Sequence, residues 1–151
     1  MAAPDQYPVE DYLCLALNRT ARAAVSAYRP WLAELGLTYP QYLVMRLLWQ
    51  RGSLPVGEIG GVLGLDYGTL SPLLKRLDGA GLLSRRRRID DERAVDVALT
   101  DAGRALEARA AEIPERFACA LGLSMAEARQ LRVLLDRVAV SLVESGGSAS
   151  A

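Results

Sequence analysis

Apolar residues follow a helical period between residues 66 and 79, in the middle of the chain. One face of this segment carries four leucines and the other carries polar side chains: Leu70, Leu73, Leu74 and Leu77 against Ser71, Lys75 and Arg76. The pattern predicts an amphipathic helix whose N-cap is Asp66 or Thr69. Pro72 forfeits no hydrogen bond if Thr69 is the cap, and it is expected to bend the helix if Asp66 is the cap. The sequence leaves both starts open.

The segments on either side of this helix complete a helix-turn-helix with a hairpin. Residues 56–63 have the pattern of a short helix, although three glycines within it lower its helical propensity. Residues 83–89 and 94–99 predict two strands, because apolar and polar side chains alternate along the second of them. Residues 89–93 form the tip between the strands. This order is that of a winged helix-turn-helix, whose second helix enters a DNA major groove.

Further helices are predicted on both sides of this unit. Before it, residues 9–28 and 31–35 are expected to form two helices interrupted at Arg29-Pro30, and a T-x-x-Q capping box at Thr38 begins a buried helix that ends near Arg51. After it, a helix that begins at Thr100 is expected to kink or split at Pro114, and Ser124 begins the last helix. Hydrophobic residues make up 51% of the whole chain, and the apolar faces of these terminal helices exceed what a small core needs. Packing them between two copies of the chain would bury the excess.

We therefore expect a mainly α (α+β) protein with a single domain over residues 1–151. The winged helix-turn-helix occupies residues 38–100, and helices within residues 9–35 and 101–144 form a homodimerisation region. Residues 145–151 are small and polar, and predict a disordered tail. A two-fold homodimer would present two recognition helices about 34 Å apart, and would bind an inverted-repeat operator in double-stranded DNA.

The charge of the chain is balanced overall but not locally. Eighteen Lys and Arg residues offset eighteen Asp and Glu residues. The segment 75–88, however, contains six cationic residues and only one acid, Asp78. These cations are Lys75, Arg76, Arg85, Arg86, Arg87 and Arg88. Such a patch suits phosphate binding, because the release of counterions supplies most of the sequence-independent affinity for DNA. The alternative is a solvated strand edge protected by arginines, and the helix-turn-helix directly upstream disfavours it.

The hairpin carries residues that resemble a known signature. Asp91-x-Arg93, followed by Leu99-Thr100, resembles the D-x-R…L-T motif of MarR-type winged-helix regulators. The resemblance covers nearly the whole chain and implies that Arg93 reaches into a minor groove while Asp91 steadies it. From the recognition helix we expect DNA contacts by Thr69, Ser71, Lys75 and Arg76. The four arginines 85–88 are expected to contact phosphates, about half of them at a time, because alternate residues of a strand face opposite sides.

The two cysteines, Cys14 and Cys119, lie far apart and fit no zinc site. The segment around Cys14, Tyr28 and Tyr39 resembles the organic-hydroperoxide sensors called OhrR. The resemblance implies that Tyr28 and Tyr39 of the partner subunit hydrogen-bond the Cys14 sulfur. A free thiol has a pKa of about 8.5, so a sensor needs donors that favour the thiolate. Asn18 departs from the pattern, since some relatives carry an aromatic residue there.

The resemblance also implies a homodimeric repressor with a redox mechanism. A peroxide would oxidise Cys14 to a sulfenic acid, and Cys119 of the second subunit would condense with it to a disulfide and release the operator. A small-molecule thiol could resolve Cys14 instead, and either cysteine could be a passive packed thiol. Two other functions stay open: a MarR-type repressor released by a small aromatic ligand, and a two-cysteine thiol peroxidase. The chain has no Pro-x-x-x-Thr-x-x-Cys segment, which weighs against the peroxidase.

Composition excludes several other classes. The chain has no histidine, and so lacks the usual metal ligand and general base; we expect no metal, no cofactor and no enzymatic activity. No apolar run approaches the length of a membrane span, and Met1–Pro8 has no signal-peptide character. The expected location is therefore the cytoplasm, without a membrane partner.

Overall fold

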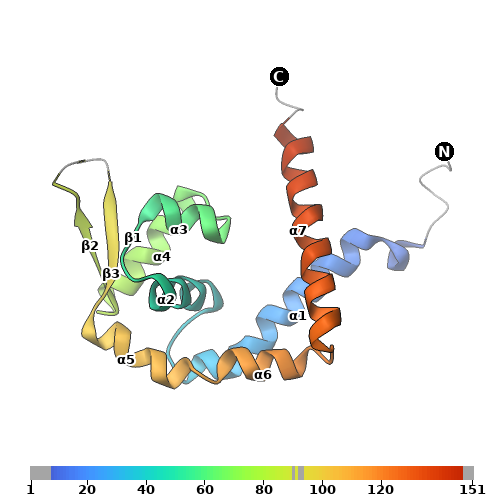
Figure 1. Cartoon of the computed structure of the whole chain (residues 1–151), viewed down its shortest axis with the longest axis horizontal. Coiled ribbons are helices and arrows are strands. Elements are labelled where there is room, and N and C mark those ends of the chain that lie inside the picture. Colours follow the sequence, from blue (N-terminus) through green and yellow to red (C-terminus); the bar gives the residue numbers. More distant parts are fainter. Residues whose placement is uncertain (1–7, 90, 92–93, 148–151) are drawn as a thin grey trace. The chain divides into compact units, whose positions relative to one another are not determined.

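The computed structural model describes residues 8–89, 91 and 94–147 (Figure 1). The chain divides into two compact units, Met1–Ile113 and Pro114–Ala151. Five α-helices and three strands are described before Ile113: α1 (Leu13–Ala33), α2 (Tyr39–Arg51), β1 (Leu54–Pro55), α3 (Val56–Leu63), α4 (Tyr67–Gly79), β2 (Leu83–Arg87), β3 (Val95–Leu99) and α5 (Asp101–Ala110), preceded by the 3₁₀-helix η2 (Val9–Asp11). Helices α6 (Ile113–Ala120) and α7 (Met125–Gly147) follow. The mainly helical fold with a small antiparallel sheet is confirmed. Among the described residues, no helix combines the length and apolar character that a membrane crossing needs.

The sheet has three strands rather than the two of a simple hairpin. Its order is β1-β3-β2, with both pairs antiparallel, and Leu54 lies opposite Val97. Strand β1 is not predicted from the sequence, because two residues are too few for an alternating pattern and Pro55 lowers the propensity further. Proline is tolerated here because β1 is an edge strand, where a missing N–H costs no ladder bond. The wing strands are also shorter than predicted, ending at Arg87 and starting at Val95.

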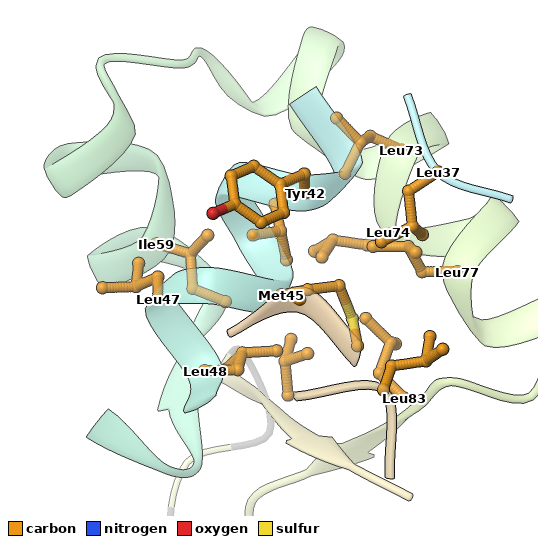
Figure 2. Packing of buried hydrophobic residues seen from close by; sticks show 14 of the residues in the cluster. Leu37, Tyr42, Met45, Leu47, Leu48, Ile59, Leu73, Leu74, Leu77 and Leu83 are labelled. Atoms are coloured by element: carbon orange, nitrogen blue, oxygen red, sulfur yellow. The ribbon is translucent and has the colours of Figure 1, made fainter. Parts of the chain in front are cut away.

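The core of the first unit lies between helix α2, the helix-turn-helix and the sheet. Figure 2 shows Met45 at its centre, with Leu74, Leu77 and Leu83 pointing toward it from α4 and β2. All four predicted leucines of α4 are buried, as are Tyr42, Val44, Met45, Leu47 and Leu48 of α2. The predicted capping box of α2 is present, since Thr38 accepts from the N–H of Gln41 and Gln41 accepts from the N–H of Thr38. The predictions of the amphipathic helix and of the buried helix before it are therefore confirmed.

Helix α1 differs from its prediction at both ends. It runs without a break through Pro30 to Ala33, so the interruption at Arg29-Pro30 and the separate helix at residues 31–35 are wrong. Proline already has a helical φ, and the hydrogen bond that it forfeits is offset by burial of Leu32, which is 1% exposed. At the other end, Tyr12 has an extended backbone and separates η2 from α1, so the single helix expected from residue 9 is also wrong.

The start of the recognition helix α4 is settled by a side-chain hydrogen bond. The carboxylate of Asp66 accepts the backbone N–H of Thr69 at 2.8 Å, so Asp66 is the N-cap and the alternative cap, Thr69, is excluded. Pro72 consequently lies inside the helix, six residues from the cap, and removes one internal hydrogen bond. In the preceding turn, a Cβ on Gly60 of α3 would lie 2.8 Å from the carbonyl oxygen of Leu65. Glycine is required there because it lets α3 approach the turn closely.

The helices after the wing split where a split is predicted. Helix α5 ends at Ala110, and α6 begins at Ile113 with Pro114 in its first turn, where a proline forfeits nothing. The predicted capping box of the last helix is present, because Ser124 and Glu127 bond each other reciprocally at 2.8 and 3.3 Å. Helix α7 extends to Gly147, so the first three residues of the predicted tail are helical. Residues 148–151 lie outside the described part.

The first turn of α5 is fastened to the connection between α4 and β2. Thr100 donates from its hydroxyl to the carbonyl of Gly81 at 2.6 Å and accepts the N–H of Gly103 at 3.0 Å. Its own N–H bonds the carbonyl of Leu82. A Cβ on Gly103 would overlap that same carbonyl, so the backbones touch directly. The residues after the recognition helix and the first turn of α5 therefore form one rigid junction.

Candidate DNA-binding and redox site

The polar face of α4 carries the residues predicted to contact DNA. These residues differ in their exposure and in their hydrogen-bonding partners. Lys75 and Arg76 are exposed, and their side chains have no ionic or hydrogen-bonding partner within the described part of the chain. Ser71 is half-buried. The hydroxyl of Thr69 donates to Asp66 at 3.1 Å. Because a threonine has only one O–H donor, Thr69 is left with acceptor capacity and does not suit a phosphate.

The capping residue Asp66 is held in its ionised form by its hydrogen bonds. Hydrogen bonds from Thr69, first from its backbone N–H and then from its hydroxyl, hold the pKa of the Asp66 carboxyl below its ordinary value. Asp66 therefore stays ionised at neutral pH, and its negative charge lies at the positive end of the helix dipole.

Two of the four wing arginines are paired with acids. The Nε of Arg85 donates to Asp78 at 3.0 Å, which ties β2 to the end of α4. The Nε of Arg88 donates to both carboxylate oxygens of Asp96 on β3, at 3.0 and 2.9 Å. Arg86 and Arg87 are exposed and have no such partner among the described residues. Of the six cations in this region, Lys75, Arg76, Arg86 and Arg87 thus remain for a polyanion.

The recognition helix and the wing flank a cavity of about 390 Å³. Ser71 from α4 and Arg85 and Asp91 from the wing are among the residues that line it. Three of the predicted DNA-binding residues therefore line the same cavity. The backbone carbonyl of Asp91 accepts the N–H of Ala94 at 2.9 Å. Arg93, the predicted minor-groove residue, lies outside the described residues.

The two predicted sensor tyrosines lie against each other. The ring centroids of Tyr28 and Tyr39 are 4.9 Å apart, and Tyr28 also lies 5.7 Å from Tyr42. Burial, with smaller contributions from Tyr39 and Tyr42, raises the pKa of Tyr28 to about 12. Burial also raises the pKa of Tyr39 and of Tyr42. These phenols therefore remain protonated near neutral pH and can donate hydrogen bonds.

Cys14 lies near the start of α1, exposed, and far from these tyrosines within one chain. Tyr28 lies fourteen positions after Cys14 on the same unbroken helix, which corresponds to about 21 Å along the axis. Tyr39 lies beside Tyr28 and shares this separation. A contact between the Cys14 sulfur and either phenol therefore requires a second chain.

Cys119 is exposed in α6, and the long helix after it has no buried side chain among those described. Exposed apolar side chains are numerous on α7, and α1 carries further ones: Leu131, Val133, Leu134, Leu135, Val140, Leu142 and Val143 on α7, Leu13 and Val25 on α1. Exposed apolar surface of this extent is typical of protein interfaces. Within the described residues, no group of His, Cys, Asp and Glu side chains has the arrangement of a metal site.

Comparison with known proteins agrees with this arrangement. The family model described as "MarR family" matches residues 37–95, which include α2, the helix-turn-helix and most of the wing. An organic hydroperoxide resistance transcriptional regulator of Bacillus subtilis is 41% identical over 130 residues, which cover 86% of each chain. The chain belongs to the MarR family. As a member of that family it is a DNA-binding regulator of transcription and not an enzyme.

Solved MarR-like structures share the fold. The PcaV regulator of Streptomyces coelicolor, solved with its natural ligand, has a TM-score of 0.82 at 26% identity, covering 94% of this chain and 99% of PcaV. Reduced AbfR bound to DNA has a TM-score of 0.76 at 29% identity, covering 87% of this chain and 90% of AbfR, a protein of Staphylococcus epidermidis. AbfR has also been solved overoxidized on DNA and in a disulfide form, with TM-scores of 0.73 and 0.58.

Three features of this MarR-type site are not predicted from the sequence. The apolar pattern marks Tyr42 only as a core residue, although its ring extends the tyrosine pair. The same pattern marks Trp49 as buried and apolar, although its indole N–H donates to the carbonyl of Gly103 at 2.9 Å. The pairing of Arg85 and Arg88 with acids is the third feature. The first two features have a sequence signal, because Tyr39, Tyr42 and Trp49 lie three and seven positions apart on one face of α2, but the same spacing describes a plain core helix.

Proposed function

We propose that the chain is a homodimeric repressor that leaves an inverted-repeat operator when an organic hydroperoxide oxidises Cys14. The observation that carries the proposal is the separation of about 21 Å between an exposed Cys14 and the protonated phenol of Tyr28 on the same helix, where Tyr28 packs on Tyr39 of α2. Two antiparallel copies of α1 would bring each cysteine to the phenols of the other chain. The hydroperoxide-resistance regulator of Bacillus subtilis, at 41% identity, supports the same reading.

The proposed chemistry uses only the two cysteines and the peroxide. The Cys14 thiolate attacks the terminal peroxide oxygen, an S–O bond forms, the O–O bond breaks, and the alkoxide leaves and takes up a proton to become the alcohol. The Cys119 thiol of the partner subunit then attacks the sulfenic sulfur, so that an S–S bond forms and water leaves. Phenol donors favour the first step because they stabilise the negative sulfur. The disulfide form of AbfR supports the step, because a similar fold accepts such a bond there.

The disulfide would weaken DNA binding by changing the distance between the two recognition helices of the dimer. It requires the Cα atoms of Cys14 and the partner's Cys119 to lie within about 7 Å of each other. Both cysteines lie on helices outside the winged unit, so drawing them together would change the spacing of the two recognition helices. An inverted repeat binds only when these helices keep the spacing of its half-sites.

A peroxide titration tests this function against its main alternative. The probe is a DNA fragment selected from random sequence by the reduced protein. We expect cumene hydroperoxide to release the protein from this fragment at lower concentration than hydrogen peroxide does, and dithiothreitol to restore binding. Release by salicylate, with no response to peroxide, would instead establish a MarR-type repressor with a small aromatic ligand, a function favoured by the likeness to ligand-bound PcaV.

The wing arginines give a separate prediction for DNA binding. At least one of Arg86→Gln and Arg87→Gln should reduce the magnitude of the slope of log affinity against log salt concentration by about one, since adjacent strand residues face opposite sides and the arginine that faces the duplex loses one phosphate contact. Arg88→Gln should change the slope less, because its guanidinium is already held by Asp96. Equal slopes for all three variants in a filter-binding series would contradict this assignment of free and paired arginines.

A further inference from the structure

A hydrogen bond connects the tyrosine-bearing helix to the junction behind the recognition helix. The indole N–H of Trp49, on α2, donates to the carbonyl oxygen of Gly103 at 2.9 Å, across 54 positions of sequence. Gly103 lies in the first turn of α5. Because Gly103 has no side chain, its backbone lies directly against the backbone of Leu82. Gly81 and Leu82 form the connection between α4 and β2. Trp49 is therefore connected to the residues between the recognition helix and the wing through the backbone of Gly103 and Leu82.

The ring of Trp49 also packs against the tyrosine cluster, which consists of Tyr28, Tyr39 and Tyr42. The indole ring lies 6.3 Å from that of Tyr42, edge to face, and Tyr42 is 3% exposed. Tyr42 lies 5.7 Å from Tyr28, which packs on Tyr39. The aromatic contacts are therefore continuous from the two phenols to the indole. Side chains packed this closely transmit displacement, because a protein core has few voids to absorb it.

We propose that Trp49 is a positioning residue for operator binding, and that it acts through the carbonyl of Gly103 to couple the tyrosine cluster to the recognition helix and wing. The proposal rests on the proposed function, because only there do the tyrosines sense a signal. The indole ring contacts Tyr42, while its N–H fixes the first turn of α5. Phenylalanine would keep the ring contact and lose the N–H.

The test compares the two tryptophans of the chain. With the selected DNA fragment as probe, Trp49→Phe in the full-length reduced protein should bind about three- to tenfold more weakly than the parent, which is the usual effect of one lost hydrogen bond. The rate at which cumene hydroperoxide forms sulfenic acid at Cys14 should stay unchanged, since the tyrosines remain. Trp31→Phe is the matched control: its ring also packs on Tyr28, at 5.8 Å, and its indole has no hydrogen bond within the described residues. This control should bind like the parent.

Tryptophan fluorescence distinguishes coupling from a purely structural role of Trp49. If Trp49 only stabilised the fold, its emission would not change when Cys14 is oxidised. The chain has two tryptophans, so Trp31→Phe leaves Trp49 as the single emitter. We expect its emission to shift when Cys14 is oxidised, and to stay constant in the Trp31→Phe, Cys14→Ser protein. Unshifted emission after complete oxidation, or equal operator affinity of reduced Trp49→Phe and Trp31→Phe, overturns the proposal. The affinity comparison needs no peroxide, so it decides the role of Trp49 even where peroxide sensing itself fails.

Discussion

Cys14→Ser should keep the protein on its operator at every concentration of cumene hydroperoxide that releases the parent. A serine hydroxyl is not oxidised by peroxides, so neither the sulfenic acid nor the disulfide can form. Serine differs from cysteine by one atom, and position 14 is exposed near the start of α1, so the fold and the affinity of the reduced protein should not change. A gel-shift titration of both proteins measures the effect, which is a complete loss of release.

Cys119→Ser separates the two redox branches. On a non-reducing gel, peroxide should convert the parent into a covalent dimer, and neither serine variant should give one. If the Cys119→Ser protein is still released from the operator, a small-molecule thiol or the sulfenic acid itself suffices, and the partner cysteine is not needed. Release of the Cys14→Ser protein at the parent's peroxide concentration would refute the proposed sensor, while leaving the DNA-binding assignment intact.

Local signals predict most of the winged unit. The helix predicted over residues 56–63 has the observed ends, because Pro55 and Gly64 bound it. The caps at Thr38 and Ser124 are also predictable, since a capping box depends on residues only three apart. In these places local sequence and final structure agree, which is the general case for an efficiently folding chain.

The features that escape prediction depend on distant contacts. Pro30 indicates a break in isolation, yet burial of Leu32 against the core holds the helix together. Strand β1 exists only because β3 lies beside it, more than forty residues later. The acid partners of Arg85 and Arg88 lie seven and eight residues away, at distances set by the α4–β2 connection and the wing. In the redox site, the tyrosine pair and the role of Cys14 follow from resemblance alone, and completion of the site by a second chain remains a proposal.

Gly103→Ala should destabilise the protein more than any other single methyl addition at its described glycines. The added Cβ would overlap the carbonyl of Leu82, and a backbone carbonyl cannot move aside as a flexible side chain does. Separation of the two backbones would also strain the hydrogen bonds of Thr100 to Gly81 and Leu82. Overpacking of this kind costs about 3 kcal/mol of unfolding free energy, which lowers the melting temperature by roughly 10 °C for a chain of this size.

Gly57→Ala is the matched control for this effect. Gly57 is an exposed residue of the first turn of α3, and an added methyl group would meet no atom within 4 Å, so alanine should stabilise the protein by about 0.5 kcal/mol. Thermal denaturation of reduced protein then compares two identical substitutions of opposite expected sign. Equal melting temperatures would mean that α5 shifts to accept the methyl group. In that case its first turn is no rigid junction, and Trp49 holds a movable element instead of a fixed one.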